Sequence, residues 1–192
     1  KYLVDAGKNK RIAVQILRPS VLGGNIMDKP IYFISKYMVF YLFAKFFHRN
    51  KSNGPVRIQA NADSKLNIIP TDYVAKVITK VFATAVEQLN IVNSKGTEII
   101  TGISKILETV NFKNINLTQD LLETASEFES SLEKFYYETI GIHLTPYLTA
   151  KPNDWDTALL ESILPIPQYN LEDYLVATIE YAKNNGFKNK RW

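Results

Sequence analysis

The sequence RIAVQILRPSVLGG (residues 11–24) joins a short apolar run to a loop with paired glycines. The apolar residues of the run are Ile12, Val14, Ile16 and Leu17. A run of this length, rich in β-branched residues and ended by Pro19, is typical of a strand that is buried on both faces of a parallel sheet. The pair Gly23–Gly24 predicts the loop that follows.

The stretch LNIIPTDYVAKVI (residues 66–78) predicts a second strand that runs directly into a helix. The strand covers residues 66–69, and the helix runs from about residue 71 to about Ala85 with one apolar face. Thr71 or Asp72 stands where an N-cap residue accepts hydrogen bonds from the first free amides of a helix. We therefore interpret Asp72 as a helix cap rather than as a catalytic group.

Strands and helices alternate outward from these two stretches. The further strands are expected at residues 56–60, 89–93 and 112–117. The further helices are expected at 97–110, at about 118–139, where the helix is acidic, in a short segment that ends near 164, and at 171–184. Residues 1–6 are expected to end a helix with Gly7 as its C-cap, and residues 145–156 are rich in turn-forming residues. This alternation predicts an α/β fold with a parallel sheet. The later part is mainly helical, so we divide the chain into residues 1–110, the sheet-bearing part, and 111–192, a helical substrate or cap subdomain.

The segment PIYFISKYMVFYLFAKFF (residues 30–47) is apolar almost all the way round a helix, and Pro30 suits a first helical turn. Lys36 and Lys45 leave uncharged stretches that are too short to cross a bilayer. The segment therefore predicts a buried helix, an oligomer interface or the wall of an apolar cleft. Peripheral contact with a membrane surface is the remaining alternative.

Composition and charge narrow the classes of site. The chain of 192 residues has no cysteine, which excludes disulfides, thiolate metal sites and cysteine nucleophiles and favours a cytoplasmic protein. Its two histidines, His48 and His143, are far apart, so we expect no metal site. Residues 1–56 carry ten Lys or Arg against two Asp. This basic quarter is interpreted as a solvated surface; phosphates or an anionic membrane are alternatives, and we expect no nucleic-acid partner.

Two of these stretches resemble a known superfamily. ILRPSVLGG (16–24) resembles the sixth strand and following loop of the extended short-chain dehydrogenase/reductases, and LNIIPTDYVAKVI (66–78) resembles their later strand–helix element. NADSKLNIIPTDYVA (61–75) and TPYLTAKPNDWDTA (145–158) are similar to the thioester-reductase and fatty-acyl-reductase-like branch. KYLVDAG (1–7) is similar to the end of the helix that carries that superfamily's catalytic Tyr and Lys.

The resemblance implies that this sequence is the C-terminal half of a Rossmann-like fold. The glycine-rich dinucleotide turn and the catalytic Ser, Tyr and Lys would all precede Lys1, so we assign no catalytic residue here. Tyr32 and Lys36 belong to a Tyr-x-x-Ser-Lys pattern but follow the Arg-Pro strand, which is the wrong order for the catalytic pair. We expect both to be scaffold, with Tyr32 packed on apolar surface and Lys36 reaching solvent.

Cofactor and substrate contacts are assigned around the first strand end. Arg18 follows a buried strand, where α/β folds place ligand contacts, and would hold a phosphate or carboxylate or form a structural ion pair. The resemblance places Pro19, Ser20 and Val21 near the nicotinamide of NAD or NADP. It places three further residues at the substrate mouth: Leu22, Asn25 and Ile26. Without the phosphate-binding turn, we expect the isolated chain to bind the dinucleotide weakly or not at all.

Two functions from different classes follow. The first is the substrate-side part of an NAD(P)-dependent reductase or epimerase-type oxidoreductase that acts on a carbonyl or acyl-derived small molecule. Its aromatic richness favours an apolar acyl substrate over a sugar, since sugar sites need many convergent hydrogen bonds. The alternative is a non-catalytic binding or assembly module on a dehydrogenase-like scaffold. In either case an exposed sheet edge predicts a homo-oligomer or pairing with an N-terminal part.

Overall fold

A computed structural model gives the fold and describes residues 2–10, 12–50, 54–119 and 128–190. The strands are β1 (Ile16–Pro19), β2 (Val21–Gly23), β3 (Val56–Gln59), β4 (Lys65–Leu66), β5 (Ile68–Pro70), β6 (Gln88–Ile91), β7 (Thr97–Glu98) and β8 (Ile115–Thr118). The helices are α1 (Tyr2–Lys10), α2 (Phe40–Arg49), α3 (Thr71–Val81), α4 (Ile99–Thr109), α5 (Ser131–Tyr136), the π-helix η2 (Tyr137–Gly141), α6 (Ile142–Leu148), α7 (Ala158–Ile163) and α8 (Leu171–Asn184).

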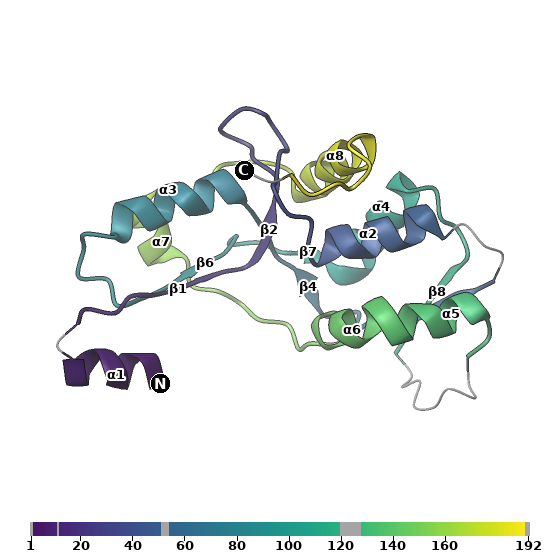
Figure 1. The fold of residues 1–192 in the computed structure, drawn as a ribbon, viewed down its shortest axis with the longest axis horizontal. Coiled ribbons are helices and arrows are strands. Elements are labelled where there is room, and N and C mark those ends of the chain that lie inside the picture. The colour runs from purple at the N-terminus through teal and green to yellow at the C-terminus, as the bar shows by residue number, and fades with distance from the viewer. Residues whose placement is uncertain (1, 11, 51–53, 120–127, 191–192) are drawn as a thin grey trace.

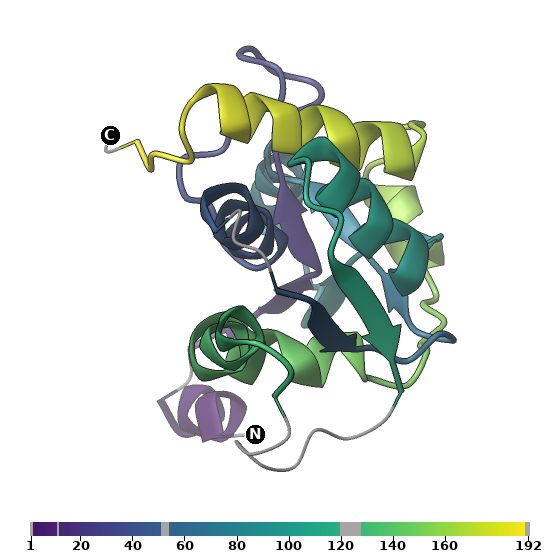
Figure 2. The ribbon, with the colours of Figure 1, turned by 90° about the vertical axis from the view of Figure 1, so that its right-hand side faces the viewer.

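The strands form short pairs that are mostly parallel. β1 pairs with β6, β2 with β5 and β3 with β8 in parallel, while β4 and β7 are antiparallel. Helices cover both sides of these strands, with α3 and α7 on the left of Figure 1 and α2, α4 and α8 on the right. Figure 2 shows α8 lying across the top of α4 and α2. The α/β fold class predicted from the alternation of elements is therefore confirmed.

Two apolar clusters fill the space between strands and helices. The larger one joins the buried aromatic side chains of α2 to α4, α8 and the α5–α6 segment, and the smaller one lies between α3, α7 and β6. The larger cluster contains residues from both sides of the division expected at residue 110, and β8 pairs with β3 across it. The division into two units stays a prediction.

The helix predicted over residues 30–47 begins ten residues later than expected, at Phe40. Tyr32 and Val39 have φ values of 62° and 48°, in the left-handed region that an α-helix of L-residues excludes. From Phe40 onward the prediction of a buried helix is confirmed, because six of its ten residues are buried. No helix in the described part of the chain is long and apolar enough to span a membrane.

The acidic helix predicted at about 118–139 is also wrong over part of its length. Thr118 ends β8, and residues 128–130, directly before α5, are not helical. Residues 120–127 lie outside the described residues. Ser130 is the N-cap of α5, where its hydroxyl accepts a hydrogen bond from the amide of Glu133 at 3.0 Å.

Glu133 is buried rather than part of a solvated acidic face. Its carboxylate accepts from the Arg57 guanidinium at 2.8 and 2.9 Å, from the Arg57 amide at 2.7 Å and from the Glu129 amide at 2.6 Å. Burial raises the pKa of Glu133, but the Arg57 bonds and the two amides outweigh it, and the net pKa is lowered. This ion pair fastens α5 to β3.

Three local expectations near the ends of the chain are corrected as well. α1 continues through Gly7 to Lys10, so Gly7 is not its C-cap. The region expected to be turn-rich from residue 145 begins inside α6, which runs to Leu148 and carries Pro146 within it. The first strand starts only at Ile16 and is not buried on both faces: Arg18 and Pro19 are exposed.

Candidate functional site

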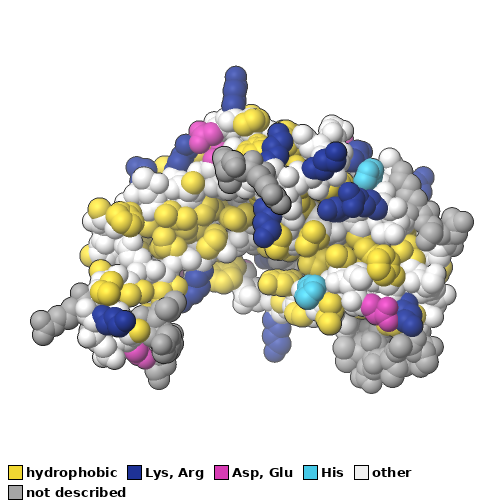
Figure 3. Space-filling view, viewed as in Figure 1, with side chains coloured by type: hydrophobic (Ala, Val, Ile, Leu, Met, Phe, Trp, Pro, Cys, Tyr) yellow, Lys and Arg dark blue, Asp and Glu magenta, His cyan; other side chains and the backbone are white. Residues whose placement is uncertain are grey.

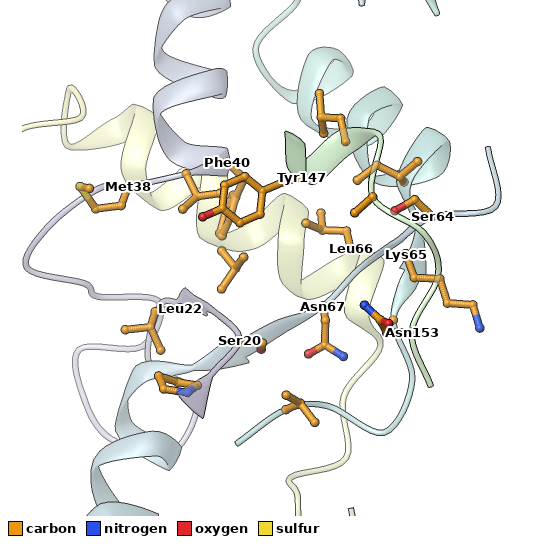
Figure 4. A pocket seen from close by; sticks show the side chains of 18 of the residues that line it. Ser20, Leu22, Met38, Phe40, Ser64, Lys65, Leu66, Asn67, Tyr147 and Asn153 are labelled. Atoms are coloured by element: carbon orange, nitrogen blue, oxygen red, sulfur yellow. The ribbon is translucent and has the colours of Figure 1, made fainter. Parts of the chain in front are cut away.

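A pocket of about 780 Å³ lies at the carboxyl ends of β1 and β6. One wall is the segment Arg18–Leu22, and the polar residues Asn67 and Asn90 lie beside it. The helical residues that line it are Phe40 and Phe43 of α2, Thr71 of α3, Ile99, Ile103 and Ile106 of α4, and Leu144, Tyr147 and Leu148 of α6. Figure 4 shows Ser20, between β1 and β2, and Asn67, between β4 and β5, on the side of the pocket opposite Phe40 and Tyr147. The carboxyl edge of a parallel sheet is where α/β folds bind ligands.

The structure brings five of the seven sequence-predicted contacts to this pocket. Arg18, Pro19, Ser20, Val21 and Leu22 all line it. The other two, at positions 25 and 26, belong to the loop that follows the glycine pair and are not part of the lining.

Ser20 and Arg18 offer polar groups to a ligand. The Ser20 amide donates to Ile91 O at 3.0 Å, which fixes the backbone to the end of β6. The Ser20 hydroxyl is buried and has no hydrogen-bond partner among the described residues. The Arg18 guanidinium donates to the neutral Gln88 Oε1 at 3.2 Å from each of its terminal nitrogens, so this contact leaves its charge available to an anion.

The glycine pair is required because two parts of the protein approach it closely. A Cβ on Gly23 would lie 2.2 Å from the Tyr174 hydroxyl of α8, and one on Gly24 would lie 2.2 Å from the Tyr32 carbonyl oxygen. Tyr174 donates to Gly24 O at 2.5 Å, and the Gly24 amide donates to Thr178 Oγ1 at 3.2 Å. α8 thus holds the turn that ends the predicted cofactor and substrate wall.

Tyr174 keeps its proton in this position. Burial raises the pKa of its phenol, and the nearby Tyr41 hydroxyl raises it further. The Tyr41 hydroxyl is itself 2.5 Å from Thr178 Oγ1, so three side chains form one buried group around the Gly24 peptide. The raised pKa keeps the phenol of Tyr174 protonated at neutral pH, so it can donate its hydrogen bond to Gly24 O of the turn.

Asp72 is not an N-cap, contrary to the sequence-based interpretation. The N-cap residue of α3 is Pro70, which makes no side-chain capping bond, although Asp72 Oδ1 accepts from the first-turn amide of Tyr73 at 2.9 Å. The Asp72 carboxylate also accepts from the backbone amides of Ile26, Met27 and Asp28, at 3.1, 2.6 and 2.8 Å. The buried carboxylate thus fixes the loop beyond Gly24, and this explains why Asn25 and Ile26 stand away from the pocket.

Tyr32 and Lys36 lie in an irregular segment and do not form a helical pair one turn apart. Tyr32 is half-buried against the larger apolar cluster, with its ring centroid 6.3 Å from that of Tyr174. Lys36 is exposed at the edge of the pocket. Both positions agree with the expected scaffold roles.

Exposure divides the pocket into an interior and a mouth. We call the interior the apolar arm; its lining includes Phe40, Phe43, Ile99, Ile103, Ile106, Leu144 and Leu148, none of which is more than 8% exposed. The mouth carries four cations, Arg18, Lys36, Lys65 and Lys151, against one carboxylate, Asp154. In Figure 3 a hollow in the middle of the molecule has apolar side chains on either side and basic ones near it.

Sequence analysis anticipated one wall of the apolar arm, because the wall of an apolar cleft was among the predictions for residues 30–47, which include Phe40 and Phe43, but it did not identify the other walls. Its α4 and α6 side chains come from segments about 40 residues apart that showed only ordinary apolar periodicity. No group of three or more metal-ligating side chains occurs in the part of the chain that the structure describes.

Comparison with known proteins identifies the fold. No family model and no curated protein matches the sequence. Among solved structures, the UDP-glucose 4-epimerase of Thermotoga maritima, solved with UDP-glucose, matches with a TM-score of 0.58 at 14% identity, over 96% of this chain and 50% of that one. The terminal R domain from the myxalamid PKS-NRPS pathway matches with a TM-score of 0.58 at 15% identity, over 99% and 49%.

A third structure, RMD from Pseudomonas aeruginosa complexed with NADPH, matches with a TM-score of 0.52 at 11% identity, over 92% of this chain and 51% of that one. The chain thus spans about half the length of the structures it matches. At these identities the likeness shows the fold alone. It confirms the predicted Rossmann-like α/β fold, which the epimerase and reductase structures share.

Proposed function

We propose that this chain is the substrate-side part of an NAD(P)-dependent reductase or epimerase-type oxidoreductase that acts on a carbonyl or acyl-derived small molecule. The observation that carries the proposal is the pocket at the carboxyl ends of β1 and β6, which has Arg18–Leu22 on one wall and apolar helices on the other. The solved structures of the same fold include proteins bound to NAD or NADPH.

The residues of the strand-end wall suit a nicotinamide ring. Ser20 has a buried hydroxyl without a partner among the described residues, between the apolar side chains of Pro19 and Val21. An amide-bearing ring placed there would satisfy that hydroxyl, and Arg18 would face the cofactor's negative charge. The bound cofactor would supply the hydride, and the wall of Arg18–Leu22 would hold its ring and exclude water from it. Leu22 contacts the substrate, and contacts by Asn25 and Ile26 stay a prediction.

The interior of the pocket favours an apolar acyl-derived substrate over a sugar. Of the described residues that line the pocket and are buried, Ser64 has a polar side chain, and the others have aliphatic or aromatic side chains. A sugar ring needs several convergent hydrogen bonds, which such a surface does not provide. The cytoplasmic location expected from the composition stays a prediction.

Expression of the complete reading frame that encodes this chain tests the proposal. We expect a glycine-rich strand–helix–strand unit and a Tyr-x-x-x-Lys motif upstream of Lys1, and oxidation of NADH or NADPH when aldehydes or acyl thioesters are added. The 192-residue chain alone serves as the control and should bind the dinucleotide weakly or not at all. An upstream region without these motifs, together with no hydride transfer, would instead support the non-catalytic module.

A further inference from the structure

The apolar arm runs along α4 for more than one helical turn. Ile99, Ile103 and Ile106 line the pocket from successive turns, and seven residues of α-helix span about 10 Å. Phe43 and Leu148 close the arm from α2 and α6, and both are buried. The arm therefore suits a long, thin apolar group better than a compact one.

The mouth has the opposite character. Lys36, Lys65 and Lys151 are exposed there, and the one lining carboxylate, Asp154, is 3.7 Å from Lys65 and fully exposed. An exposed pair of this kind is weak and easily exchanged for another anion. The mouth therefore carries a net positive charge directly above an apolar interior.

We propose that the pocket binds an anionic amphiphile, with one alkyl chain in the apolar arm and the anionic end among the mouth lysines, and that Ile106 limits the length of the chain. This inference rests on the proposed function, since it names the substrate class of the same pocket. Ile99 is near the mouth, because its amide donates to Ser64 O, directly before β4 with its mouth residue Lys65. Ile106 is the α4 residue of the lining that lies farthest along the helix from Ile99. A longer chain meets Ile106 after shorter ones have filled the arm.

Binding of a homologous series tests the length limit. Straight-chain alkanoates from hexanoate to tetradecanoate are titrated into the protein by calorimetry, below their micelle concentrations. Each added methylene should lower Kd about fourfold until the arm is full, after which Kd should level off. A Kd that does not depend on chain length would overturn the proposal.

Variants of α4 locate the limit. Ile106→Phe should move the levelling-off to shorter chains, and the milder Ile106→Val should move it to longer ones, so the test survives if one variant does not fold. Ser104→Phe is the matched control, because Ser104 is exposed on α4 and does not line the pocket. An equal effect of Ser104→Phe and Ile106→Phe would contradict the assignment.

Charge variants test the anionic end separately. Lys36→Gln combined with Lys151→Gln should weaken every alkanoate by the same factor, on the order of tenfold, without moving the levelling-off. Alkylammonium ions of the same lengths should bind more weakly than the alkanoates, and equal binding would exclude an anionic end.

The outcomes separate this inference from the proposed function. Length-dependent alkanoate binding without hydride transfer by the complete protein would refute the oxidoreductase and leave the amphiphile site intact. Hydride transfer to short carbonyl substrates, together with an alkanoate Kd that does not depend on chain length, would support the oxidoreductase and refute the amphiphile site.

Discussion

Two neighbouring parts of the chain contrast sharply in how they are held. We call residues 12–19, which include β1, the edge strand, and residues 23–28 the glycine turn. Among the described strands the edge strand pairs with β6 alone, and Ile12 at its start is 60% exposed. The glycine turn, four residues further on, is enclosed by Tyr174 and Thr178 of α8 and by Asp72 of α3.

The contrast shows that apolar sequence and structural constraint are separate properties. The edge strand is the more apolar of the two, and its side-chain hydrogen bonds, from Gln15 and Arg18, are exposed or only partly buried. The glycine turn is fixed by hydrogen bonds to the buried side chains of Tyr174, Thr178 and Asp72. Buried donors and acceptors are costly to leave unpaired, whereas an exposed apolar side chain has little to lose. Substitutions in the glycine turn should therefore destabilise the protein far more than substitutions in the edge strand.

Gly24→Ala is expected to have the largest effect. Its Cβ would lie 2.2 Å from the Tyr32 carbonyl oxygen and 2.4 Å from the carbonyl carbon, and backbone cannot move aside as a flexible side chain can. We expect a loss of about 3 kcal/mol in the free energy of unfolding, measured with urea. Gly102→Ala is the control: its nearest contact is the Leu66 side chain at 3.0 Å, and the gain in helix propensity offsets the crowding. Equal losses in both variants would show that the turn is not specially constrained.

Asp72→Asn is expected to cost about 2 kcal/mol, because an amide NH₂ group replaces an acceptor oxygen and leaves amides of the loop unpaired. Asp72 Oδ2 accepts from both Met27 and Asp28. Asp28→Asn is the matched control, since it removes only the exposed ion pair with Lys76 and should cost less than about 1 kcal/mol. A larger loss for Asp28→Asn in urea unfolding would mean that the loop is held from its surface instead.

Tyr174→Phe should cost about 1 kcal/mol, since it keeps the buried ring but removes the hydrogen bond to Gly24 O. Tyr147→Phe, at a tyrosine that is 63% exposed, should change the unfolding free energy by less than about 0.5 kcal/mol. Thermal and urea unfolding measure both. Indistinguishable values for the two variants would remove Tyr174 from the contacts that hold the turn.

The same variant has an alkaline signature. Burial raises the pKa of Tyr174 in the folded protein, so the unfolded chain loses that proton first as the pH rises above about 10. The stability linked to the neutral phenol is therefore complete below the unfolded pKa and is lost progressively above it. Tyr174→Phe should lose less stability than the wild type between about pH 9 and 11. Parallel stability curves would contradict the buried position of the phenol.

The sequence predicts the elements whose signals are local. α8 matches its expected range of 171–184, because Asn170 caps it by accepting from the Asp173 amide at 3.0 Å. The segment 30–47 is predicted poorly, since a stretch that is apolar on all sides gives no helical phase. Nothing local signals that Tyr32 and Val39 adopt positive φ. Those angles are imposed by packing against residues that are distant in sequence.

The candidate site divides in the same way. Arg18–Leu22 were predicted because a strand end and a superfamily resemblance both mark them, and all five line the pocket. The apolar arm is assembled from α2, α4 and α6, whose proximity is a tertiary property. Glu133 shows the limit of charge patterns, since the acidic pattern of residues 118–139 does not signal that this one glutamate is buried in an ion pair with Arg57. Pattern assigns a face to each helix, but it does not identify the partner that covers it.

The smallest effect on stability is expected for Ile12→Ser at the start of the edge strand, combined with Phe82→Ser at the C-terminal end of α3. The two side chains are 60% and 82% exposed. We expect the unfolding free energy to change by less than about 0.5 kcal/mol per site, because both side chains are already in water.

Self-association should respond more strongly to the same double variant, since burying one such side chain between molecules contributes about 1.5–3 kcal/mol. Sedimentation velocity should show the wild type associating between micromolar and near-millimolar concentration, and the double variant needing at least about tenfold more protein. Ile142→Ser, at a position 63% exposed on α6, controls for the general loss of apolar surface. If Ile142→Ser reduced association as much as the double variant, the contact between molecules would not be specific to Ile12 and Phe82. A wild type that stayed monomeric at every concentration would show that the edge strand makes no contact between molecules.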